Sequence, residues 1–189
     1  FITNYPKSIR HVKFKKLKEL ININKKKINF VSVLVNPNYE TLEKIKNFNF
    51  DYYQLYNVSP EKTKIIKKKY KVKIITALTI KNKEDVNQYK NYKSISEIIL
   101  FDSKGYEKSI GFDHKLLNNV PTTIHRMLAG NIQYNDKLDK YSKITDIIDI
   151  SGSLETNGKK DLSKIDILLE RVNRIINENK KRYSSNWST

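Results

Sequence analysis

The 189-residue sequence contains no cysteine, and this absence excludes several kinds of chemistry within these residues. Without thiols there is no disulfide framework, no thiolate metal site, no iron–sulfur cluster and no cysteine nucleophile. The three histidines, His11, His114 and His125, are too few and too scattered to suggest a zinc site. No run approaches about 18 apolar residues, which excludes a transmembrane helix, and nothing resembles a secretory signal. We therefore expect a cytoplasmic protein with no metal site and no membrane partner.

Acidic residues are few beside the basic ones, with 20 Asp and Glu against 37 Lys and Arg and a net charge of +17. Such a charge can indicate nucleic-acid binding, because lysine and arginine neutralise phosphates. However, lysine, asparagine and isoleucine together make up 78 of the 189 residues, a skew that an A- and T-rich coding sequence produces without functional demand. The lysines are also dispersed where amphipathic helices would face solvent. We interpret them as solvated helix faces and expect no nucleic-acid partner; a basic nucleic-acid-binding protein is the alternative from a different class.

Apolar, β-branched runs alternate with longer charged segments whose apolar residues have helical spacing, a rhythm typical of repeated βα units. The residues 134–141 are predicted to form one of the helices, and Phe1-Ile2 is predicted to end an earlier strand. Six further strands are predicted, each followed by a helix, at residues 28–35, 51–56, 72–80, 97–101, 122–129 and 146–150.

The number of units predicts an α/β fold of the (β/α)8 or TIM-barrel type, which uses about 30 residues per unit. The first strand–helix unit and the start of the second strand are expected to be absent from this chain. An open doubly wound sheet is the alternative, but the sequence has only 5 glycines and no GxGxxG fingerprint. Residues 1–182 are predicted to form a single, N-terminally incomplete barrel domain, and residues 183–189 a flexible tail.

In a barrel of this kind the functional groups lie where the strands end. The predicted last two strands are followed by Gly130-Asn131 and by Gly152-Ser153, polar turns whose backbone N–H groups suit a phosphate. The alternative is that the two glycines merely make tight turns. Asp102 ends an apolar strand, where a carboxylate costs desolvation energy unless it has a partner or a catalytic role. Its alternative role is a helix cap or a salt bridge to Lys104.

Eight segments that lie in order along nearly the whole chain carry a resemblance to a known family. They are Phe1-Ile2 with Tyr5-Pro6-Lys7-Ser8-x-Arg10, Val33-x-Val35-Asn36-Pro37, Gln54-Leu55-Tyr56-Asn57, Ile99-Leu100-Phe101-Asp102-Ser103, Phe112-Asp113, Leu128-Ala129-Gly130-Asn131, Asp149-Ile150-Ser151-Gly152-Ser153-Leu154-Glu155 and Gly158-Lys159-Lys160-Asp161. On these segments the sequence is similar to the phosphoribosylanthranilate isomerases. It departs from that family in three places: the family's His-Gly after the fourth strand is replaced by Tyr56-Asn57, its second glycine after the seventh strand by Asn131, and its glycine-rich loop after the sixth strand is shortened to residues 104–111.

The resemblance implies an enzyme of tryptophan biosynthesis that performs an Amadori rearrangement of N-(5-phosphoribosyl)anthranilate to 1-(2-carboxyphenylamino)-1-deoxyribulose 5-phosphate. It implies Asp102 as general acid, Arg10 as partner of the anthranilate carboxylate and Gln54 as a substrate-binding residue. The family's general base is a cysteine, expected upstream of Phe1.

By the same resemblance, the backbone N–H groups of Gly130, Asn131, Gly152 and Ser153 would hold the phosphate of a phosphorylated small-molecule substrate. No metal or organic cofactor is implied, and a monomer or weak homodimer is expected. Another phosphate-binding barrel, such as an indole-glycerol-phosphate synthase, is the alternative, although its catalytic lysine and glutamate signatures are not evident.

Overall fold

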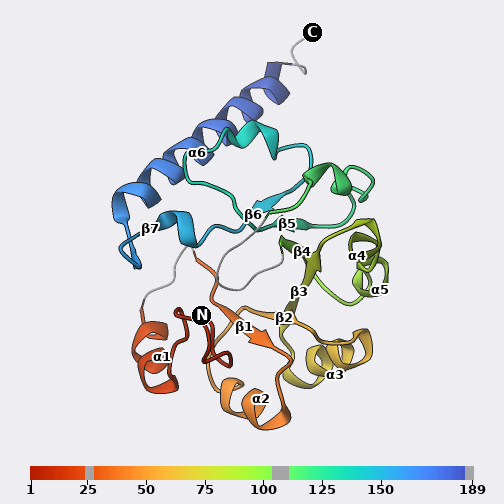
Figure 1. Ribbon diagram of the computed structural model, residues 1–189, viewed down its shortest axis with the longest axis vertical. Helices are drawn as coiled ribbons and strands as arrows, with labels where there is room; N and C mark the ends of the chain where they lie inside the picture. The colour runs from red at the N-terminus through yellow and green to blue at the C-terminus, as the bar shows by residue number, and fades with distance from the viewer. Residues whose placement is uncertain (24–27, 104–110, 186–189) are drawn as a thin grey trace.

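The computed structural model describes residues 1–23, 28–103 and 111–185 (Figure 1). Its main feature is a parallel sheet whose strands neighbour each other in sequence order, the arrangement of a (β/α)8 barrel. Ile2 extends this sheet by bridging Val33 in parallel, as expected for the end of an earlier strand. The six strands are β1 (Val31–Val35), β2 (Tyr52–Tyr56), β3 (Lys73–Ile80), β4 (Ile98–Ser103), β5 (Arg126–Leu128) and β6 (Ile147–Ile148).

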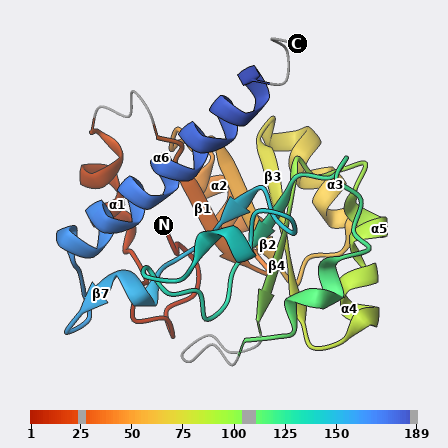
Figure 2. The ribbon, with the colours of Figure 1, turned by 90° about the horizontal axis from the view of Figure 1, so that it is seen from above.

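Helices connect the strands and cover the outer face of the sheet. Figures 1 and 2 show α1 to α5 outside β1 to β4, whereas α6 lies beside β5 and β6. No helix among the described residues is long and apolar enough to cross a membrane. The α-helices are α1 (Phe14–Ile21), α2 (Tyr39–Ile45), α3 (Pro60–Tyr70), α4 (Lys83–Asn87), α5 (Tyr89–Tyr92) and α6 (Leu162–Ser185); the 3-10 helices are η1 (His114–Leu117), η2 (Leu138–Lys140) and η3 (Gly152–Leu154).

The second half of the sheet is less regular than predicted. Strands β5 and β6 are shorter than the predicted 122–129 and 146–150, and the helix predicted at 134–141 is wrong because the segment contains only η2. The side chain of Asp136 accepts hydrogen bonds from the backbone N–H of Gln133 and from the hydroxyl of Tyr141. Such side-chain bonds compete with the backbone ladder of a helix, so this segment folds as turns.

The C-terminal helix also differs from the prediction. Helix α6 continues to Ser185, which is three residues into the predicted tail at 183–189. Residues 186–189 lie outside the described residues.

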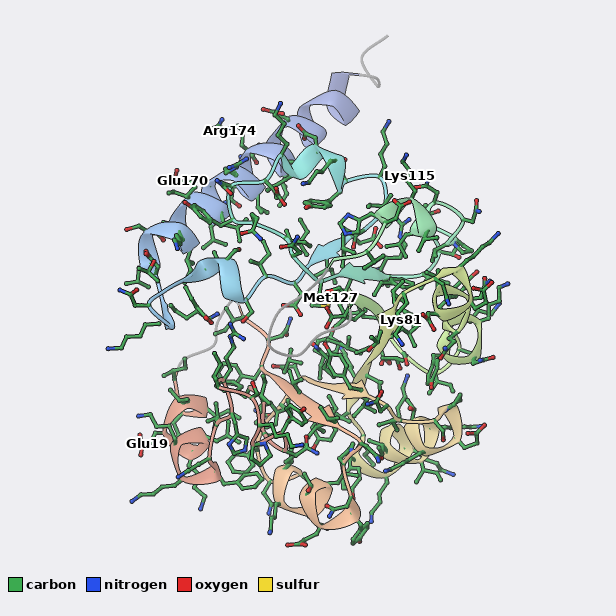
Figure 3. The ribbon with its side chains drawn as sticks, viewed as in Figure 1. Glu19, Lys81, Lys115, Met127, Glu170 and Arg174 are labelled. Atoms are coloured by element: carbon green, nitrogen blue, oxygen red, sulfur yellow. The ribbon has the colours of Figure 1, made fainter. Side chains whose placement is uncertain are left out.

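Alternation along the strands divides the apolar side chains between two layers, because successive residues of a strand point to opposite faces. Leu55 and Phe101 point outwards and pack with helix residues in two clusters. Leu100 and Ala129 belong instead to a cluster formed by residues within the strands or directly after them, which fills the interior of the barrel. Met127, at the centre of Figure 3, is partly buried in this inner cluster. The direction of each side chain at a strand end is therefore set by its place in this alternation.

Candidate active site

A chain of hydrogen bonds inside the barrel leads to Asp102 at the end of β4. Gln54 and Tyr56 are two residues apart on β2 and so share the inward face. The Gln54 Nε2 group donates to the Tyr56 hydroxyl oxygen at 3.3 Å, and the Tyr56 hydroxyl donates to Asp102 Oδ2 at 2.8 Å. Gln54 was predicted to bind substrate; it is buried and reaches Asp102 through Tyr56.

Tyr56 therefore takes the place of the partners that the sequence suggested for Asp102. Burial, with the nearby Asp102 charge, raises the pKa of Tyr56 well above its usual value, so its hydroxyl stays a neutral donor. Lys104, the predicted salt-bridge partner, lies outside the described residues. A tyrosine at the position of the family's histidine thus holds one oxygen of Asp102 in a fixed direction.

A second carboxyl group, Asp149, shares the interior with Asp102. Phe101 is paired with Leu128, and Leu128 with Ile148, so the residues that follow these three lie at one level of the barrel. Those residues are Asp102, Ala129 and Asp149, and the middle one carries only a methyl group.

The shared interior changes the acidity of both carboxyl groups. Burial raises the pKa of Asp102, against the hydrogen bonds from Tyr56 and the Ser103 backbone. Burial and the neighbouring Asp102 charge raise the pKa of Asp149 to about 6, although Lys160 and the N-terminal ammonium act in the opposite direction. Two neighbouring carboxyl groups with restricted access to water retain a proton at a higher pH than isolated ones do. In the described part of the chain no three His, Asp or Glu side chains gather to hold a metal ion.

Arg10 is held by a carboxylate from the opposite end of the chain. Its Nε donates to Glu155 Oε1 at 2.7 Å and its Nη2 to Glu155 Oε2 at 2.8 Å. Lys160 Nζ donates to the same Glu155 Oε1 at 2.7 Å. These two cations hold the pKa of Glu155 down to about 2, with the Arg10 hydrogen bonds as the largest cause. Glu155 lies in β7 (Glu155–Thr156) and Lys160 in β8 (Lys159–Lys160), the two strands of a small antiparallel hairpin.

The turn after β5 requires glycine at its first position. Gly130 has a φ of +97°, and a Cβ there would lie 2.4 Å from Ser103 Oγ and 2.9 Å from the Ser103 backbone nitrogen. Asn131 follows with a φ of 54°, and Asn57 after β2 has a φ of 55°. Asparagine tolerates this left-handed conformation better than other non-glycine residues. Asparagine can therefore occupy these two turns, where the family resemblance leads one to expect glycine.

The turns after β5 and β6 leave hydrogen-bond donors available. Within residues 1–23, 28–103 and 111–185, the backbone N–H groups of Gly130, Asn131, Gly152 and Ser153 have no protein acceptor. The Ser153 hydroxyl is also buried without a partner in this part of the chain. Buried donors normally find an acceptor, and grouped backbone N–H groups favour an anion. A Cβ on Gly152 would lie 3.4 Å from Arg10 Nη2, so the second turn borders the guanidinium.

The structure therefore places Asp102 at the end of β4 and the four predicted phosphate-binding residues after β5 and β6, whereas Gln54 lies within β2. It also brings further residues to this part of the barrel. Asp149, Tyr56, Glu155 and Lys160 were present in the motifs but were not predicted as site residues. Asp149 could have been found from its place beside Asp102 in an inward-facing alternation. The partners of Arg10 could not, because Glu155 is 145 residues away in the sequence.

Comparisons with known proteins give one family. The model of the family "PRAI: N-(5'phosphoribosyl)anthranilate (PRA) isomerase" matches residues 2–171. An N-(5'-phosphoribosyl)anthranilate isomerase of Staphylococcus haemolyticus is 30% identical over 180 residues, covering 89% of this chain and 85% of its own.

Solved structures agree with the fold. The phosphoribosyl anthranilate isomerase of Thermotoga maritima matches with a TM-score of 0.77 at 22% identity, covering 88% of this chain and 83% of its own. A second matching structure is a phosphoribosyl anthranilate isomerase in complex with reduced 1-(o-carboxyphenylamino)-1-deoxyribulose 5-phosphate. It has a TM-score of 0.75 at 22% identity, and the match covers 88% of this chain and 82% of its own. These matches confirm the predicted (β/α)8 barrel fold.

Proposed function

Because the chain belongs to the N-(5'-phosphoribosyl)anthranilate isomerase family, we propose that it serves the isomerisation of N-(5-phosphoribosyl)anthranilate to 1-(2-carboxyphenylamino)-1-deoxyribulose 5-phosphate in tryptophan biosynthesis. The observation that carries this proposal is Asp102, a carboxyl at the end of β4 whose pKa burial raises, in a barrel that also presents Arg10 and two turns with backbone N–H groups suited to an anion. A phosphate, a carboxylate and a sugar ring between them are the chemical features of this substrate.

Asp102 would supply the proton that opens the ring. The protonated carboxyl gives its proton to the furanose ring oxygen, the bond from C1 to that oxygen breaks, and the nitrogen lone pair forms the Schiff base. Removal of the proton at C2 then gives the enolamine, which tautomerises to the ketone. The hydrogen bond from the Tyr56 hydroxyl to Oδ2 stabilises the carboxylate that Asp102 becomes after the transfer.

The two charged ends of the substrate would be bound separately. The backbone N–H groups of Gly130, Asn131, Gly152 and Ser153 suit the phosphate, and the Ser153 hydroxyl adds a donor that has no partner among the described residues. The planar guanidinium of Arg10 suits the planar anthranilate carboxylate. Gln54 would act through Tyr56 on the acid.

The general base of the reaction is not present among these residues as the cysteine that the family uses. The family resemblance implies a cysteine base, and the 189 residues contain no cysteine. The proposal therefore assigns to this chain the acid and the binding of both anionic groups. The match to the isomerase family model favours this reading over an indole-glycerol-phosphate synthase.

Calorimetric titration with reduced 1-(o-carboxyphenylamino)-1-deoxyribulose 5-phosphate tests the proposal without requiring turnover. We expect saturable binding of one molecule per chain, and much weaker binding of the same compound without its phosphate. Ser153→Ala should weaken binding of the phosphorylated compound, with Ser142→Ala, an exposed serine, as the control. Absence of binding, together with salt-dependent binding of an oligonucleotide, would instead support the nucleic-acid alternative.

We also propose a cytoplasmic protein that is a monomer or a weak homodimer. The isomerases of this family are metabolic enzymes of small molecules, which supports the location. Analytical ultracentrifugation over a range of concentrations tests the association state: a single monomeric species, or dissociation on dilution, is expected, and a stable higher oligomer would contradict it.

A further inference from the structure

We propose that Glu155 is a positioning residue that holds one edge of the Arg10 guanidinium, so that the adjacent, end-on edge receives the carboxylate of the substrate. The inference rests on the proposed function, because it concerns the same ligand. It goes further by assigning recognition of the carboxylate to a pair of residues, of which only Arg10 would touch the ligand.

The hydrogen bonds of Arg10 leave one complete edge of the guanidinium available. A guanidinium has five N–H donors, and Glu155 accepts from Nε and from one N–H of Nη2. Among the described residues no acceptor lies on Nη1 or on the second N–H of Nη2. Of the three remaining N–H groups, one on Nη1 and one on Nη2 form the end-on edge, which fits a second carboxylate with two parallel hydrogen bonds. The Arg10 side chain as a whole is 31% exposed.

Glu155 is itself fixed from two sides. Lys160 Nζ bonds Glu155 Oε1 at 2.7 Å and also donates to the backbone oxygen of Ser151 at 2.8 Å. Lys164 Nζ donates to the Glu155 backbone oxygen at 2.7 Å. With its side chain only 11% exposed, Glu155 cannot rotate freely without breaking these bonds.

The same contacts connect the guanidinium to the turn proposed for the phosphate. Only η3 separates Ser151 from Glu155, and Arg10 Nη2 borders Gly152. The short segment from Ser151 to Glu155 thereby sets the spacing between the phosphate-binding N–H groups and the carboxylate-binding edge of Arg10. Without Glu155, Arg10 would have to be ordered by the ligand itself, at a cost in side-chain entropy.

The test compares two ligands in calorimetric titrations with the chain. One is reduced 1-(o-carboxyphenylamino)-1-deoxyribulose 5-phosphate, and the other is the same compound without its carboxylate. We expect Glu155→Gln to weaken binding of the first ligand about tenfold or more, which corresponds to the loss of one charge-assisted hydrogen-bond pair. The affinity for the second ligand should stay within about twofold of that of the unsubstituted chain. Arg10→Met should show the same selectivity, and the double variant should lose no more than Arg10→Met alone.

Two further variants keep the result interpretable. Glu43→Gln is the matched control, because Glu43 also pairs with two lysines, Lys46 and Lys69, but on the helix side of the molecule; neither ligand should be affected. Glu155→Asp keeps the charge beside Lys160 while shortening the side chain. It should again weaken only the carboxylate-bearing ligand, even if Glu155→Gln fails to fold.

Each other outcome overturns the inference. Equal weakening of both ligands would mean that Glu155 only stabilises the hairpin, and no weakening would mean that Arg10 needs no support. If the unsubstituted chain binds the carboxylate-free ligand as well as the other, Arg10 does not recognise the carboxylate. Failure of the unsubstituted chain to bind either ligand would contradict the proposed function and, with it, this inference.

Discussion

The carboxyl groups at the strand ends lie in two contrasting environments. Asp102 and Asp149 share the barrel interior, where burial raises the pKa of both groups, that of Asp149 to about 6. Glu155, in the hairpin, lies between Arg10 and Lys160, and its pKa falls to about 2. The same functional group is therefore suited to carry a proton in one place and to remain a fixed negative charge in the other. What differs is whether the burial of the carboxyl is compensated by cations.

The largest effect on turnover is expected from substitution of Asp102, the proposed acid in the barrel interior. Asp102→Asn removes the proposed acid while keeping its shape, so turnover of N-(5-phosphoribosyl)anthranilate should fall by about 10²- to 10⁴-fold. The rate is to be measured in a protein that also carries the cysteine base that the family resemblance implies. Circular dichroism of the variant should match that of the unsubstituted protein. Unchanged turnover would remove Asp102 as the acid.

Gly130 packs against Ser103, the neighbour of Asp102. Gly130→Ala should lower the free energy of unfolding by about 2 to 5 kcal/mol, from backbone strain and overlap with Ser103. Gly158→Ala is the control: it has a φ of +73° but nothing within 4 Å of an added Cβ, so only strain of about 1 kcal/mol is expected. Urea unfolding measures both. Equal losses would show that contact with Ser103 is unimportant.

The pH dependence of stability should have opposite signs for the two kinds of carboxyl. Asp149 has a raised pKa, so its ionisation destabilises the fold as the pH rises from about 4 through about 6. Asp149→Asn should therefore be more stable at pH 7, by about 2 to 3 kcal/mol at most, and equal to the unsubstituted protein below about pH 4.

Glu155 has a lowered pKa, so its contribution to stability is present above about pH 4.5 and is lost as the pH falls towards about 2. Glu155→Gln should be less stable at neutral pH, with a difference that shrinks in acid. Urea unfolding between pH 3 and 8 measures both variants. The same sign of pH dependence for both would contradict the contrast between the two regions.

Tyr56→Phe should have a smaller effect, by removing the hydrogen bond that stabilises ionised Asp102. We expect the pKa of Asp102 to rise, measured by carbon NMR of its carboxyl, and turnover to change by about fivefold, the equivalent of about 1 kcal/mol. Tyr53→Phe is the matched control, because Tyr53 lies on the same strand but packs in the outer cluster. A fall in the Asp102 pKa in Tyr56→Phe would contradict the assigned role.

The smallest effects are expected at the two asparagines in left-handed conformation. Asn57→Gly and Asn131→Gly should change the free energy of unfolding by less than about 0.5 kcal/mol, because glycine adopts positive φ without strain. Alanine at either position should cost about 1 kcal/mol. Thermal unfolding of the glycine and alanine variants at each position measures the difference. A loss with glycine as large as with alanine would show that the asparagine side chains matter for another reason.

The sequence by itself determined the alternation of strands and helices, the barrel and the family. These follow from local patterns: apolar β-branched runs that predict strands, and the helical spacing of apolar residues in the segments between them. It also placed Asp102 and Arg10 at strand ends, where their catalytic and binding roles stay predictions. The helix predicted at residues 134–141 is wrong, because side-chain hydrogen bonds there outweigh the helical pattern.

Only the tertiary structure decided which of these groups meet. Asp149 faces the same interior as Asp102 because the register across β4, β5 and β6 places both at one level. Glu155 reaches Arg10 from 145 residues away. Burial and charge pairing, which determine whether a carboxyl carries a proton, depend on such distant contacts, whereas strand and helix patterns depend on near neighbours in the chain.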